Sequence, residues 1–68
     1  MKISITATPI HRGKVIEGTF HTYTLVGMEL TDEAIGRTVN SAIANARVMG
    51  WHMADPEIWI RLELRQLP

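Results

Sequence analysis

Three segments of the chain have the residue patterns of β-strands. Residues 2–7 alternate strictly, which is the period of a half-buried strand. Residues 15–30 are rich in β-branched and aromatic side chains that favour strands, and Gly18 and Gly27 mark places where so long a segment would bend. Residues 58–64 alternate again and predict the last strand.

A helical period separates the second and third of these segments. Thr31 can cap a helix with its hydroxyl, and Asp32 and Glu33 suit the positive end of its first turn. Gly50 is a stop signal, since glycine takes the left-handed C-cap without strain, and we expect Trp51 to fold back over the last turn. One apolar stripe is predicted from the spacing of Ile35, Val39, Ala42, Ile43, Ala46 and Met49.

The resulting element order is β-β-α-β, which predicts a single α+β domain over residues 1–68. The simplest arrangement is a three-stranded antiparallel sheet in the order 2-1-3, with the helix packed on one face. Nothing else in the chain is left to cover the other face of that sheet, which is called the open face below.

The open face is the predicted interaction surface. If the even-numbered residues of 58–64 face the helix, Trp59 and Arg61 face the other way. The register we expect for the second strand places His21, Tyr23 and Leu25 on the same face. Apolar patches rimmed by polar groups tend to mark interaction sites, and Trp, Tyr and Arg are enriched at interface hot spots. The alternatives are a set of singly exposed residues, or a register slip at a bulge.

Composition limits how the domain is stabilised and what it binds. At 68 residues the core is small, and there is no cysteine for disulfides, so we expect self-association to supplement it. Seven basic residues balance seven acidic ones, which argues against nucleic acid as the main partner and against a membrane-surface helix. The first ten residues alternate instead of forming the apolar core of a signal peptide, so a cytoplasmic location is predicted.

Residues able to carry chemistry are scattered. We find no glycine-rich phosphate loop and no nucleophile elbow, and helix capping explains the paired carboxylates Asp32 and Glu33. His11, His21 and His52 lie in separate segments, without the spacing of a zinc site. The sequence therefore predicts no enzymatic activity, no metal and no cofactor.

Residues 32–51, "DEAIGRTVNSAIANARVMGW", resemble part of the dodecins, small flavin-storing proteins in which a helix packs on a three-stranded sheet. A dodecin has its hairpin after the helix, whereas this chain has it before, so membership of the family is not predicted. The size and the lack of catalytic motifs also resemble the small accessory proteins of phages and plasmids, which often block a host protein.

The function expected from the sequence is that of a non-enzymatic protein-interaction module, homo-oligomeric and binding or inhibiting a protein partner. The first alternative is single-stranded nucleic acid binding on the sheet, with Tyr23 and Trp59 stacking on bases and Lys2, Arg61 and Arg65 on phosphates. The second alternative is binding of a flavin-like ligand at an oligomer interface.

Overall fold

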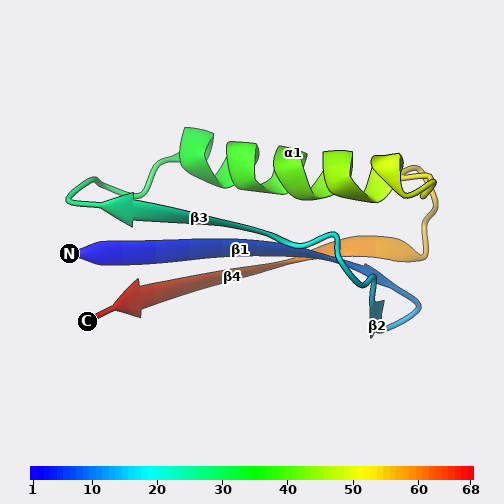
Figure 1. Ribbon diagram of the computed structural model, residues 1–68, viewed down its shortest axis with the longest axis horizontal. Helices are drawn as coiled ribbons and strands as arrows, with labels where there is room; N and C mark the ends of the chain where they lie inside the picture. The colour runs from blue at the N-terminus through cyan, green and yellow to red at the C-terminus, as the bar shows by residue number, and fades with distance from the viewer.

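The computed structural model describes residues 1–68 and contains one helix on one antiparallel sheet (Figure 1). The elements are β1 (Lys2–His11), β2 (Lys14–Val15), β3 (His21–Val26), α1 (Asp32–Val48) and β4 (Ile58–Leu67). β1 is central, with β4 on one edge and with β3 and the short β2 on the other. The predicted α+β class and the central first strand are confirmed, and the two-residue β2 is an addition to the predicted order.

β1 and β2 form a hairpin at one end of the sheet. Its two-residue turn has positive φ angles at Arg12 (52°) and Gly13 (78°), the combination whose twist matches that of antiparallel strands. Pro9, which has no N–H to donate, lies beyond the last β3 residue, and its carbonyl accepts a bond from Ile16 N at 3.0 Å. The proline therefore costs the sheet no hydrogen bond.

Both predicted helix caps are confirmed. Thr31 Oγ1 accepts a hydrogen bond from Ala34 N at 3.1 Å. At the other end Gly50 has φ +92°, its N–H donates to Arg47 O at 2.9 Å, and Trp51 N donates to Ala46 O at 3.1 Å. These two bonds are those of a Schellman motif, which satisfies carbonyls that the last turn leaves free.

The Gly50→Val variant should lose more than ~1 kcal/mol of unfolding free energy, because a β-branched residue is strained at positive φ. A Cβ at Gly50 would meet nothing within 4 Å, so the loss would report the backbone alone. Gly36→Ala is the matched control: this glycine is helical and equally unobstructed, so the change should stabilise by about 1 kcal/mol. Urea unfolding of both variants checks this, and an unchanged midpoint for Gly50→Val would contradict it.

Small residues make the contact between α1 and the sheet. The buried helix positions are Ala34, Thr38, Ala42 and Ala46, one every four residues, and Thr38 satisfies its hydroxyl by donating to Ala34 O at 2.8 Å. The predicted stripe was therefore rotated from the true contact line. Its large members Ile35, Val39 and Ile43 are only half-buried, and Met49 is exposed.

The helix covers only part of the sheet. α1 packs on β1 and β3, and in Figure 1 it runs along β3, on the far side of β1 from β4. The core cluster lies beneath its first turn, where Ile5, Leu25 and Ala34 are buried together. α1 does not have the length and apolar character needed to cross a membrane. The helix-side face of β4 is consequently left without a cover.

Candidate interaction surface

Three of the five predicted interface residues face the helix and not the open face. Antiparallel partners share a face, and His21, Tyr23 and Leu25 pair with Ala7, Ile5 and Ile3, which lie under the helix. Leu25 is buried, and Tyr23 and His21 are half-buried. The predicted register was wrong because residues 20–28 carry apolar side chains on both faces, so alternation alone does not choose between them.

Trp59 and Arg61 do lie on the open face, opposite Ile10 and Thr8 of β1. Trp59 is 64% exposed. Hydroxyl groups occupy most of the rest of this face on β1 and β3, and the hydroxyls of Thr6 and Thr22 lie 3.0 Å apart. The open face is thus mainly polar, with Trp59 and Val26 as its exposed large apolar side chains, and not the aromatic patch that we expected. The hydroxyl residues are Ser4, Thr6, Thr8, Thr22 and Thr24.

An uncovered apolar surface lies on the helix side of β4. Ile60, Leu62 and Leu64 pair with Pro9, Ala7 and Ile5, and so face the same way as the core. Leu62 is 40% exposed and Leu64 51% exposed, while Ile60 is half-buried. These three residues are called the β4 strip. The sequence predicted them to face the helix, but it gave no sign that the helix would stop short of them.

The half-buried apolar side chains of α1 stand on the side of the helix away from β3. Arg37 lines a hollow with Tyr23 and Leu25, so its side of the helix faces β3. Ile35, Val39 and Ile43 stand on the opposite side of the buried contact line and therefore face β4.

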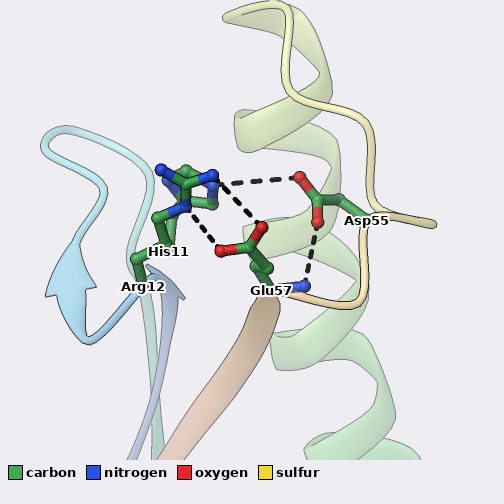
Figure 2. Close-up of polar contacts among 4 residues, drawn as sticks. All are labelled: His11, Arg12, Asp55 and Glu57. Carbon is green, nitrogen blue, oxygen red and sulfur yellow. Dashed lines mark hydrogen bonds and ion pairs between the residues drawn. The ribbon is translucent and has the colours of Figure 1, made fainter.

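A second cluster, called the polar clasp, joins the β1–β2 turn to the segment before β4 (Figure 2). The guanidinium of Arg12 binds both carboxylate oxygens of Glu57, with Nη2 donating to Oε1 at 3.2 Å. Arg12 N also donates to Glu57 O at 3.1 Å, and Asp55 Oδ1 accepts from Glu57 N at 2.9 Å. His11 Nε2 lies 3.8 Å from Asp55 Oδ2.

The geometry of the polar clasp is that of a structural contact. At 3.8 Å the His11 and Asp55 atoms are too far apart for a hydrogen bond, so the pair has no proton-transfer geometry. The His11 ring instead lies against Trp51, with ring centroids 4.9 Å apart, beside an open hollow of about 480 Å³ that Met49 also lines. No three His, Asp or Glu side chains gather where they could hold a metal ion.

The two surfaces differ in what they offer another molecule. The polar groups of the clasp are hydrogen-bonded or ion-paired with one another. The β4 strip, in contrast, exposes two leucines on a strand that pairs on one side only. The β4 strip is therefore the candidate interaction surface. No protein-family model, no characterised protein and no solved structure matches the chain.

Proposed function

We propose that the chain is a non-enzymatic protein-interaction module of the cytoplasm that acts by binding protein through β4, assembling with itself and blocking a protein partner. The observation that carries the proposal is the β4 strip, where Leu62 and Leu64 are about half exposed beside an unpaired strand edge. Exposed apolar surface of this kind, adjoining a charged face, is typical of protein contacts.

The size of the domain supports the same proposal. Only 12 of the 68 residues are buried, and eight hydrophobic residues make up the core. A domain with so little buried surface gains more from an added apolar contact than a larger one does. Covering the β4 strip would extend the core without a change in the fold.

The nucleic acid alternative has less support. Its two stacking residues were Tyr23 and Trp59, and Tyr23 now lies on the helix side of the sheet. Lys2, Arg61 and Arg65 share the open face with Glu63, so the charge there is mixed. The flavin-like alternative placed its ligand at an oligomer interface, and the exposed indole of Trp59 is the feature that supports it.

The Leu62→Lys/Leu64→Lys variant should sediment as a monomer at micromolar concentrations where the native chain forms an assembly, because two ammonium groups prevent burial of the β4 strip. Val26→Lys/Val48→Lys is the matched control, since both valines are exposed and lie on other surfaces. It should keep the native mass. Circular dichroism should confirm that both variants are folded.

The proposal would be contradicted by a native chain that stays monomeric and retains no protein from cell extract that the lysine variant fails to retain. Salt-sensitive retention of the native chain on an oligonucleotide column would favour the nucleic acid alternative instead. Visible absorbance in the purified protein would favour the flavin-like one.

A further inference from the structure

The outer edge of β4 lacks most of the devices that usually protect an edge strand. Native sheets shield their edges with short strands, charged side chains (lysine above all), proline or bulges, and of these β4 has only the charged side chains of Arg61, Glu63 and Arg65, which stand on the open face. β4 spans ten residues, Ile58–Leu67, pairs only with β1, and contains no lysine, proline or glycine. The opposite edge of the sheet consists of the six residues of β3 and the two of β2. β4 is thus the one long strand able to accept another strand.

The backbone groups that face this free edge belong to the even-numbered residues. Arg12 N donates to Glu57 O, which makes residue 57 a bonded partner of the β1 side. Bonded and non-bonded pairs alternate along an antiparallel ladder, so the odd residues of β4 point their N–H and C=O groups toward β1. Those of Ile60, Leu62, Leu64 and Gln66 therefore point outward, whereas the N–H of Ile58 already donates to Asp55 O at 3.1 Å.

We propose that a second copy of this chain occupies the edge, with the two β4 strands antiparallel about a twofold axis that passes between their Leu62 residues. This inference rests on the proposed function and names the partner and the register. A twofold axis perpendicular to the sheet keeps both helices on the same side. Residues of equal parity then lie opposite each other, as antiparallel strands require.

Charge on the open face selects the register. With Leu62 at the axis, Arg61 of each copy lies opposite Glu63 of the other, and Trp59 lies opposite Arg65 of the other. These are non-bonded pairs, in which side chains approach most closely. Both ion pairs and a cation–π contact are therefore available in this one register.

Registers shifted by one or two residues bring like charges together or shorten the overlap of the two strands. An axis at Glu63 places the two Glu63 residues opposite each other and Arg61 opposite Arg65. An axis at Arg61 places two arginines together. An axis at Leu64 restores opposite charges, but it pairs Leu62 with Gln66 and leaves Trp59 beyond the end of the second strand. Like charges directly opposite destabilise a sheet, and a shorter overlap makes fewer bonds.

The helix side favours the same register. Leu62 meets Leu62, and Ile60 of each copy meets Leu64 of the other. All of these residues belong to the β4 strip, so pairing would join the strips of the two copies into one apolar surface. The outward N–H and C=O groups of Ile60, Leu62 and Leu64 would also exchange hydrogen bonds with those of the second copy.

Cysteine cross-linking tests the register, because the chain contains no cysteine of its own. Bonded antiparallel partners have Cα atoms about 5.5 Å apart, within the range that a disulfide spans. Leu62→Cys should form a covalent dimer under mild oxidation. In Leu64→Cys the two thiols would be offset by four residues, about 13 Å along the strand, so this control should remain uncross-linked.

Exposed positions provide a second measurement if either leucine variant fails to fold. Arg61→Cys mixed with Glu63→Cys should give a mixed disulfide in at least ten-fold excess over either homodimer. Cross-linking of Leu64→Cys but not of Leu62→Cys would overturn the register. A native assembly in which no β4 pair cross-links would overturn the inference alone. A native monomer that still binds another protein through the β4 strip would overturn both the inference and the self-assembly in the proposed function, and would leave only its binding of a protein partner.

Discussion

The Ala42→Leu variant should unfold at a denaturant concentration well below that of the native chain, with a loss of about 1–3 kcal/mol or more. Ala42 is fully buried in the line of small residues by which α1 contacts the sheet. A leucine there has no space unless the helix moves away from β1, and moving it would expose the rest of the contact line. Since small domains have unfolding free energies of about 5 kcal/mol, this is a large fraction of the total.

Ala44→Leu is the matched control for this prediction. The substitution is the same, the helix is the same, and Ala44 is exposed on the far side. Its free energy of unfolding should stay within about 0.5 kcal/mol of that of the native chain. Urea titration followed by circular dichroism measures both variants. Equal midpoints for the Ala42 and Ala44 variants would mean that the helix does not pack through its small residues.

Local signals predicted the order of elements well. The Thr31 cap and the Gly50 stop act through the backbone within one turn, so their effect does not depend on the rest of the fold. The central position of β1 was predicted as the simplest arrangement of a hairpin followed by a crossover helix. Gly18 and Gly27 have positive φ and flank β3, at the places where bends were expected.

Packing between elements was predicted less well, for two physical reasons. Alternation fixes which residues of a strand share a face, but not which face is buried when both carry apolar groups. The pairing of Tyr23 with Ile5 decided this for β3. The helix stripe was predicted from the spacing of apolar residues, and of its members only Ala42 and Ala46 lie on the contact line. Small residues make this contact because they let the helix approach the sheet closely.

The β4 strip is exposed because the helix lies toward the β3 edge of the sheet. No local sequence pattern indicates where across the sheet a helix packs. By alternation, Leu62 and Leu64 face the same way as the buried residues of β1, and the sequence therefore predicted that the helix would cover them. They are exposed because α1 packs on β1 and β3, one strand away. Trp59 and Arg61 were placed on the open face by the same alternation, and their part in an interface stays a prediction.

The two ion pairs proposed between copies make β4 sensitive to a reversal of charge. In the native chain Arg61 Nε and Glu63 Oε1 lie 3.1 Å apart, with both side chains about half exposed, so this contact within the strand contributes little. Across the proposed axis the same two residues would form two pairs, one for each copy. A charge change at one position is therefore felt twice.

Glu63→Arg should weaken self-association about ten- to hundred-fold, because it replaces two attractive pairs with two repulsive ones worth about 1–3 kcal/mol together. Arg61→Glu/Glu63→Arg should restore the native dissociation constant, since each arginine again lies opposite a glutamate. Glu17→Arg changes the net charge by the same amount at an exposed position off β4, and it should associate like the native chain. Sedimentation equilibrium over a range of concentrations and at low salt gives all four constants. If the double variant associates no better than Glu63→Arg alone, the two side chains do not face each other across the axis, and the register centred on Leu62 is wrong.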